Sequence, residues 1–261
     1  MQAQNTSRIF FQRVLWGLLL LACCGWGFLK PSLGRQSEAL RVMVFAPHPD
    51  DELVGCGGSI ARHVSLGNKV TVVYLTSGDA GNIHYSKEEL SRIREEESRL
   101  GMQLLGVDDL VFLRNKDGYL QADANNLVKV VELLRKAKPS VVYLPAASDA
   151  HQDHKATNEL VLRAINKARG SWFQEAQGEP WSVKTVFGYE VYPLMQSVSY
   201  CEDISPFMEL KLKALKEHKS QLESIAYDDV AQSKDRYRGI LNLGAKYAEC
   251  FEVIRISDYF K

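Results

Sequence analysis

An excess of one charge is missing from this sequence, because 32 Lys and Arg residues balance 32 Asp and Glu residues in a chain of 261. Without a basic surplus to neutralise phosphates, general nucleic-acid binding is disfavoured, and we expect no nucleic-acid partner. Hydrophobic residues make up 46% of the chain and charged residues 25%, and glycine and proline follow no repeat period. This composition excludes a disordered or collagen-like chain, and the length suits one large α/β domain.

Cysteine is scarce, and its five positions form no C-x-x-C pair: Cys23, Cys24, Cys56, Cys201 and Cys250. An odd, scattered set argues against a disulfide scaffold and against a zinc ribbon. Nothing in the sequence around Cys56 argues for a nucleophile, so we expect this side chain to be buried packing.

The motifs of two common enzyme classes are incomplete. Residues 55–60 (GCGGSI) follow a predicted strand, but Ile60 stands where a dinucleotide fingerprint requires a third Gly or Ala. Residues 57–61 (GGSIA) lack the last Gly of the G-x-S-x-G elbow of serine hydrolases. Both classes are therefore disfavoured.

The amino-terminal segment is apolar, and residues 14–29 carry no charged side chain. As a helix they reach roughly 24 Å, and adding residues 9–13, with Arg13 snorkelling toward the headgroups, brings the span to about 31 Å, enough for a ~30 Å hydrocarbon core. Trp16 and Trp26 lie near the two ends, as interfacial aromatics do. We expect a single-pass membrane anchor at 1–30 and a linker at 31–40.

Other interpretations of this segment stay open. A cleaved signal peptide would release the rest of the chain, and residues 20–23 (LLAC) resemble a lipoprotein cleavage site that would lipidate Cys23. A core helix is less favoured, because a linker with Pro and Gly separates the segment from the first strand. Basic residues occur on both sides of the apolar run, so the orientation is open.

The remaining sequence alternates short apolar runs with longer helix-like segments. Expected strands cover residues 41–46, 70–76, 110–113, 141–144, 183–191 and 250–256; expected helices cover a stretch ending near 66 and residues 87–105, 125–137, 155–167 and 206–225. This order predicts an α/β, Rossmann-like, mostly parallel sheet with helices on both faces, preceded by the amino-terminal hydrophobic helix. Within the carboxyl-terminal third, residues 195–249 are expected to form solvated helices.

Two loops that follow predicted strands contain three of the six histidines: residues 47–52 (PHPDDE) and 149–154 (DAHQDH). Alone, an acidic run before a helix is commonly a cap, and a loop histidine is usually solvated. Together, at the edge where a parallel sheet binds ligands, they suit zinc or another divalent transition metal with one open position. Two prolines stiffen the first loop, so that adjacent Asp50 and Asp51 can take different roles.

PHPDDE followed by HQDH resembles the LmbE-like, or phosphatidylinositol-glycan class L (PIG-L), zinc-dependent de-N-acetylases. The resemblance covers residues 41 to at least 162, including 76–81 (TSGDAG) and 94–97 (REEE). It implies that residues 41–261 form one catalytic domain that removes the acetyl group from an N-acetylglucosaminyl-type substrate. Gln152 stands where many members have Pro, and the HQDH ending is nearer to the bacterial and archaeal members.

The resemblance also implies roles for individual residues. His48, Asp51 and His154 are the expected ligands of Zn²⁺. Asp50 is the expected general base, which takes a proton from the water that attacks the acetamide carbonyl. The donor of the proton to the leaving amine stays open between Asp50 and His151.

Three further residues complete the expected site. His151 faces the metal, oriented by Asp153, and in its protonated form stabilises the carbonyl oxygen. Arg94 is expected to hold a substrate hydroxyl or phosphate with its planar donor fork; the alternative is a surface ion pair with a Glu of the same helix.

A membrane anchor beside such a domain predicts an acetamido-sugar or glycoconjugate substrate that is lipid-linked or part of the envelope. The alternative function of a different class is a membrane-tethered metal- or sugar-binding protein without catalytic turnover.

Overall fold

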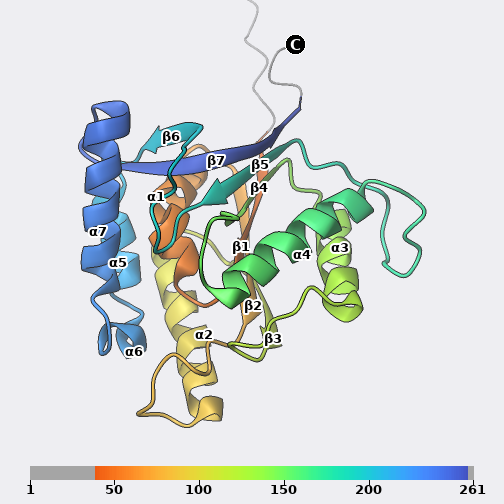
Figure 1. Cartoon of the computed structure of the whole chain (residues 1–261), viewed down its shortest axis with the longest axis horizontal. Coiled ribbons are helices and arrows are strands. Elements are labelled where there is room, and N and C mark those ends of the chain that lie inside the picture. The colour runs from red at the N-terminus through yellow and green to blue at the C-terminus, as the bar shows by residue number, and fades with distance from the viewer. Residues whose placement is uncertain (1–38, 258–261) are drawn as a thin grey trace, which may run out of the picture. The chain divides into compact units, whose positions relative to one another are not determined.

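The Val-rich segments form the centre of one seven-stranded sheet in the computed structural model, which describes residues 39–257 (Figure 1). The strand order is β3-β2-β1-β4-β5-β7-β6, with five parallel strands, β7 antiparallel to β5, and β6 antiparallel to β7. The strands are β1 (Arg41–Ala46), β2 (Lys69–Thr76), β3 (Asp109–Asn115), β4 (Val141–Pro145), β5 (Thr185–Tyr189), β6 (Tyr200–Asp203) and β7 (Ala248–Ile256). The predicted α/β fold with a mostly parallel sheet is confirmed.

Helices cover both faces of the sheet (Figure 1). On one side lie α1 (Asp51–Ser65), α2 (Lys87–Leu104), α5 (Met208–Leu215), α6 (Lys219–Leu222) and α7 (Tyr227–Arg238), which continues into a π-helical turn, η1 (Gly239–Leu243); on the other lie α3 (Ala124–Ala137) and α4 (Gln152–Ala168). Alternate side chains of β1 enter the two cores, with Val42 and Val44 in one and Met43 and Phe45 in the other. This two-sided burial explains why the strand reads as a continuous apolar run.

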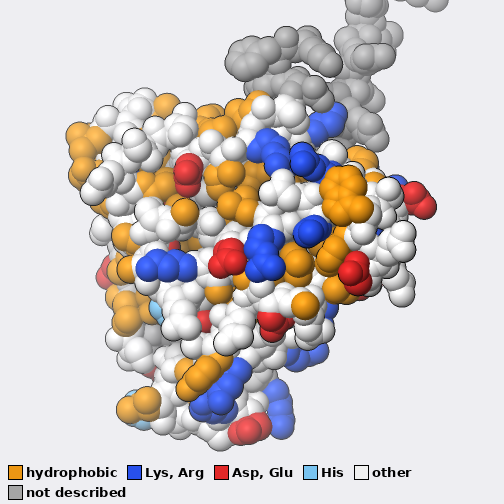
Figure 2. Space-filling model, turned by 45° about the vertical axis from the view of Figure 1, so that its right-hand side comes forward, with side chains coloured by type: hydrophobic (Ala, Val, Ile, Leu, Met, Phe, Trp, Pro, Cys, Tyr) orange, Lys and Arg blue, Asp and Glu red, His pale blue; other side chains and the backbone are white. Residues whose placement is uncertain are grey.

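The surface matches the balanced charge of the sequence. On the face that includes α3 and α4, basic and acidic side chains are interspersed with hydrophobic ones (Figure 2).

The strand order reverses at β1, which pairs with β2 on one side and with β4 on the other. The chain leaves β1 toward β2 and β3 and later returns to β4 and β5. The loops that follow β1 and β4 therefore meet at the carboxyl edge of the sheet, at the place where open α/β sheets bind ligands.

The prediction of one helix over residues 206–225 is wrong, because α5 and α6 are separate helices with a turn between them. The turn lets the backbone nitrogen and Oγ of Ser220 each donate to the carboxylate of Glu97 at 2.7 Å, which satisfies a largely buried acid of α2. Local helical periodicity cannot reveal this partner, which lies 123 residues away.

The expectation of solvated helices over residues 195–249 is also corrected. Lys211 and Asp235 are fully buried, and Tyr200–Asp203 form the strand β6. Charged side chains of this region pair with one another inside the fold. A high content of charged residues therefore does not show that the segment is exposed to solvent.

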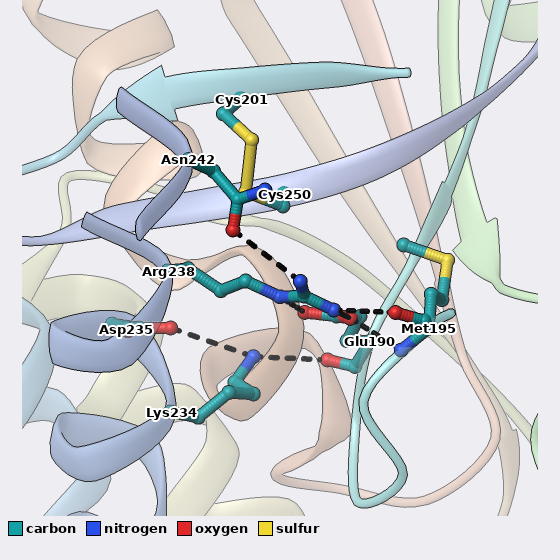
Figure 3. Close-up of a disulfide and its surroundings, with 8 residues drawn as sticks. All are labelled: Glu190, Met195, Cys201, Lys234, Asp235, Arg238, Asn242 and Cys250. Carbon is teal, nitrogen blue, oxygen red and sulfur yellow. Dashed lines mark hydrogen bonds and ion pairs between the residues drawn. A yellow bond between two sulfur atoms is a disulfide. The ribbon is translucent and has the colours of Figure 1, made fainter. Parts of the chain in front are cut away.

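Cys201 and Cys250 form a disulfide between β6 and β7, which corrects the expectation drawn from the scattered cysteines (Figure 3). The two residues face each other in the antiparallel register, with Cα atoms 4.1 Å apart. Cys56 is buried and free, as expected.

The predicted hydrophobic helix and anchor at residues 1–30, and most of the linker at 31–40, lie outside the described residues. Among residues 39–257, no helix has the length and apolar character needed to cross a membrane.

His218 lies buried between α5 and α6, and neither ring nitrogen has a hydrogen-bond partner. Burial, reinforced by the nearby Arg94, lowers its pKa to about 3. Below about pH 6.5, His218 binds a proton in the unfolded chain but stays neutral in the folded chain. The free energy of unfolding therefore falls as the pH is lowered.

We predict that His218→Leu weakens this acid sensitivity. Both proteins are compared without metal. From pH 7 to pH 5, the free energy of unfolding should fall in both, and the fall should be about 2 kcal/mol smaller in His218→Leu than in the wild type. Urea unfolding at both pH values measures the difference. Replacement of the exposed His84 by Gln is the control, and equal losses in wild type and His218→Leu would contradict the prediction.

Candidate metal centre and active site

The loop between β1 and α1 is fixed by backbone hydrogen bonds. The backbone nitrogen and Oγ1 of Thr76 donate to the carbonyl of Pro47 at 3.0 and 2.9 Å, and the backbone nitrogen of His48 donates to Asp51 Oδ2 at 2.9 Å. Asp50 has a φ of 128°, in a region that residues other than glycine rarely adopt. Such strain persists only where surrounding contacts determine it. With this backbone conformation the two adjacent carboxylates point to different partners: Asp51 contacts histidines, and Asp50 contacts Arg94.

Asp51 links the two loops. Its Oδ2 lies 3.0 Å from His48 Nδ1 and 3.2 Å from His154 Nε2, and the two imidazole centroids are 5.3 Å apart. The contacts with His154 and His48 outweigh burial and hold the pKa of Asp51 well below its usual range. Asp51 Oδ1 is buried without a hydrogen-bond partner, and the buried His154 Nε2 makes the ion-pair contact with Asp51 Oδ2 but no hydrogen bond of acceptable geometry. Because buried polar atoms are normally satisfied, this donor set fits a divalent cation.

His151 completes a cluster of three imidazoles. Its centroid lies 4.9 Å from that of His48 and 4.8 Å from that of His154. One ring nitrogen from each of the three histidines lies within 4.8 Å of the others, a grouping that could hold a metal ion. His151 is exposed whereas His48 and His154 are buried, so His151 lies at the rim of the site.

Asp149 orients His154. Its Oδ2 lies 2.9 Å from His154 Nδ1, and its Oδ1 accepts the backbone nitrogen of His151 at 2.9 Å. In the neutral ring this carboxylate favours a proton on Nδ1, so that the Nε2 lone pair faces Asp51 and is available to a metal ion. Although burial opposes it, the charges of Asp51 and Asp149 raise the pKa of His154 to about 9. Sequence reasoning missed this role, although Asp149 belongs to the second motif.

Asp153 and Asp117 hold the other side of His48, whose Nε2 lies 3.1 Å from a carboxylate oxygen of each. This differs from the expectation that the Asp153 carboxylate orients His151. Asp153 contacts His151 through its backbone nitrogen, which donates to Nδ1 at 3.2 Å, while its carboxylate also accepts backbone N–H groups from the loop after β3. Asp117 was not a sequence candidate, because no histidine or motif accompanies it in that loop.

Arg94 lies against Asp50 inside the protein. Its Nη2 is 3.0 Å from Asp50 Oδ2 and also donates to the carbonyl of Pro49, while Nη1 donates to the carbonyl of Gly78 at 3.1 Å. The residue is only 2% exposed, which excludes the alternative of a surface ion pair along α2. Burial raises the pKa of Asp50 to about 7, although Arg94 opposes the shift. The arrangement gives a carboxylate that is held in place and titrates near neutral pH.

An aromatic side chain that sequence reasoning also missed borders the site. Tyr192, in the segment after β5, stacks on His154 with a centroid distance of 5.8 Å and lies at the same distance from Tyr227. Tyr192 is 42% exposed, so part of its ring faces solvent beside the histidines. Its position after a parallel strand was the only signal available in the sequence.

A histidine and carboxylate cluster at the switch point of an open α/β sheet defines the class of this protein, an enzyme fold with a candidate metal centre. The chain belongs to the PIG-L (GlcNAc-PI de-N-acetylase) family. The sequence model of this family matches residues 43–165. The family predicted from the two motifs is thereby confirmed.

Similar proteins agree with this assignment. Diacetylchitobiose deacetylase from Thermococcus kodakarensis is 29% identical over 228 residues, 82% of each chain. The solved N,N'-diacetylchitobiose deacetylase from Pyrococcus horikoshii is 27% identical, with a TM-score of 0.75 and coverage of 83% of this chain and 84% of that one. The conserved protein TT1542 from Thermus thermophilus is 31% identical, with a TM-score of 0.76 and coverage of 84% and 97%. The chain is an amide-hydrolysing enzyme of this deacetylase family.

Removing the acidic partner of His154 should weaken metal binding. We predict that Asp149→Asn lowers zinc affinity by about 10- to 100-fold, because the amide no longer fixes the ring through a charged acceptor, and that His154→Ala lowers it further. Competition with a chromogenic chelator measures both. Exchange of the exposed Gln152 for Ala is the control, and unchanged affinity in His154→Ala would remove this residue from the ligand set.

Proposed function

We propose that this protein is a zinc-dependent deacetylase that removes the acetyl group from an N-acetylglucosaminyl-type sugar. The observation that carries the proposal is the convergence of His48, Asp51 and His154 beside the separately held carboxylate of Asp50. The names of the similar deacetylases support an acetamido sugar as the substrate class.

We assign His48, Asp51 and His154 as the residues that hold the metal. Two imidazoles and one carboxylate are a ligand set of catalytic zinc sites, and other divalent transition metals suit the same donors. When bound, zinc supplies Lewis acidity, which lowers the pKa of water toward ~7 and polarises an amide carbonyl.

Asp50 is the proposed general base. It takes a proton from the water that attacks the acetamide carbon, and its pKa of about 7 suits a group that must accept and release a proton near neutral pH. Arg94 holds one of its carboxylate oxygens. We propose that Arg94 positions Asp50 and does not make the predicted substrate contact, because it is 2% exposed and both Nη atoms already contact protein acceptors.

His151 is the proposed hydrogen-bond donor to the carbonyl oxygen. Because Nδ1 accepts the backbone nitrogen of Asp153, the neutral ring has its proton on Nε2. Burial and the neighbouring His48 and His154 lower the pKa of His151, which favours this neutral form over the protonated form predicted for the mechanism from the sequence. Asp50 then returns its proton to the leaving nitrogen, and acetate and a free amine are the products.

Asp50→Asn tests this mechanism, because asparagine has nearly the same shape as aspartate but cannot accept the proton. We predict that zinc content stays unchanged, while turnover of N,N'-diacetylchitobiose falls by at least about 10²-fold. Amine release and metal analysis provide the two measurements. Glu88→Gln, on the exposed part of α2, is the matched carboxylate control. Near-native turnover in Asp50→Asn would disprove the assignment of the base.

We further propose that residues 1–30 anchor the enzyme to a membrane and that the natural substrate is a lipid-linked or envelope glycan. The support is the uncharged run over residues 14–29, which has a tryptophan near each end. We predict that the full chain stays in the membrane fraction after an alkaline carbonate wash. Its release into the supernatant would contradict the anchor and leave the catalytic proposal untouched.

A further inference from the structure

Helix α1, which begins with Asp51, is interrupted one turn later. Cys56 has φ −148° and ψ 24°, outside helical values, between the turn that begins at Asp51 and the part that ends at Ser65. A break in a helix leaves carbonyl groups before it and amide groups after it without their usual partners. Residues 51–61 are all buried, so these groups need partners from elsewhere in the protein.

Charged side chains from the carboxyl-terminal third satisfy both sides of the break. The carbonyl of Val54 accepts hydrogen bonds from the Nζ atoms of Lys211 and Lys234, each at 3.0 Å. On the other side, the backbone nitrogens of Gly58 and Ser59 each donate to the carboxylate of Glu249 at 2.8 Å, and Ser59 Oγ donates to it at 2.7 Å. Glu249 thus caps the second part of the helix from β7.

One ammonium group joins these two caps. Lys211 Nζ lies 2.7 Å from Glu249 Oε1 and 2.6 Å from Asp235 Oδ2, and all three residues are fully buried. Lys234 connects the cluster to the segment after β5, because it also donates to the carbonyl of Glu190 (Figure 3). Buried ion pairs add little net stability compared with apolar packing, so the main effect of this cluster is on geometry.

The turn between Asp51 and the break has little freedom on its other side. A Cβ atom at Gly55 would lie 2.2 Å from Cδ2 of Tyr189, so the backbone of the turn rests directly on this ring. The Tyr189 hydroxyl in turn donates to the carbonyl of Phe45 in β1 at 2.8 Å. The turn that carries Asp51 is therefore held between the central sheet and the ionic cluster.

We infer that Glu249 and Lys211 are positioning residues for the metal centre, an inference that rests on the proposed metal site. By capping the break in α1, they fix the turn that places Asp50 and Asp51 relative to the histidines. A ligand set of this kind requires its side chains within about 0.5 Å of the productive geometry, so a small shift of the turn weakens metal binding and catalysis together.

Glu249→Gln tests the inference, because it keeps the side-chain volume but removes the charge and one acceptor. We expect zinc affinity, measured by chelator competition on the metal-free protein, to fall about tenfold. We expect kcat for N,N'-diacetylchitobiose to fall while KM changes little. Glu202→Gln is the matched control, because Glu202 faces Glu249 in the β6–β7 register but pairs with Arg62 at the far end of the same helix.

A second control separates positioning from general destabilisation. Val131→Ala creates a cavity in the core on the other face of the sheet and should lower the unfolding temperature without changing zinc affinity. The double variant Lys211→Met/Glu249→Gln removes both charges, and we expect it to recover unfolding temperature relative to Glu249→Gln but not zinc affinity. If Glu249→Gln does not fold, this double variant provides the measurement.

The inference is overturned if zinc affinity in Glu249→Gln equals that of the wild type or of Val131→Ala, or if the double variant regains full affinity. A wild-type protein that binds no zinc would instead refute the proposed metal site, so the two failures are distinguishable.

Discussion

The contact of one carboxylate oxygen with two imidazoles is the constraint on which the rest of the site depends. Asp51 Oδ2 lies within 3.2 Å of nitrogens from His48, in the loop after β1, and His154, in the first turn of α4. These segments are far apart in the sequence but follow the paired strands β1 and β4. Both imidazoles contact further carboxylates on their other nitrogens. His154 therefore lies between two acids and His48 among three, Asp51, Asp117 and Asp153, so each ring has little freedom to move.

This arrangement concentrates negative charge in a buried space. Carboxylates of Asp51, Asp149 and Asp153 surround the two histidines, and burial makes an uncompensated charge costly. One way to compensate this negative charge is to protonate the histidines, and the pKa values of His48 and His154 are accordingly raised. A divalent cation would provide the same compensation, with proton release on binding. The electrostatics of the cluster thus favour the cation that the proposed chemistry requires.

Local sequence patterns predicted the central strands and the two loops, because the apolar runs of β1 and β4 end at conspicuous polar residues. The order of strands and helices was enough to expect those loops at one edge of the sheet. The disulfide, the role of Asp117 and the contact between Arg94 and Asp50 could not be predicted in this way. Each depends on side chains that meet only through tertiary packing, such as the β6–β7 register that pairs Cys201 with Cys250.

The carboxyl-terminal third shows why such contacts escape a reading of local patterns. Lys211, Lys234 and Glu249 resemble solvated surface charges in sequence, yet they are buried and reach α1 from three different elements, α5, α7 and β7. The break in α1 creates polar groups that apolar residues could not satisfy, and these charges satisfy them. The irregular turn that carries Asp51 therefore depends on charged residues that are distant in the sequence, so neither feature can be explained without the other.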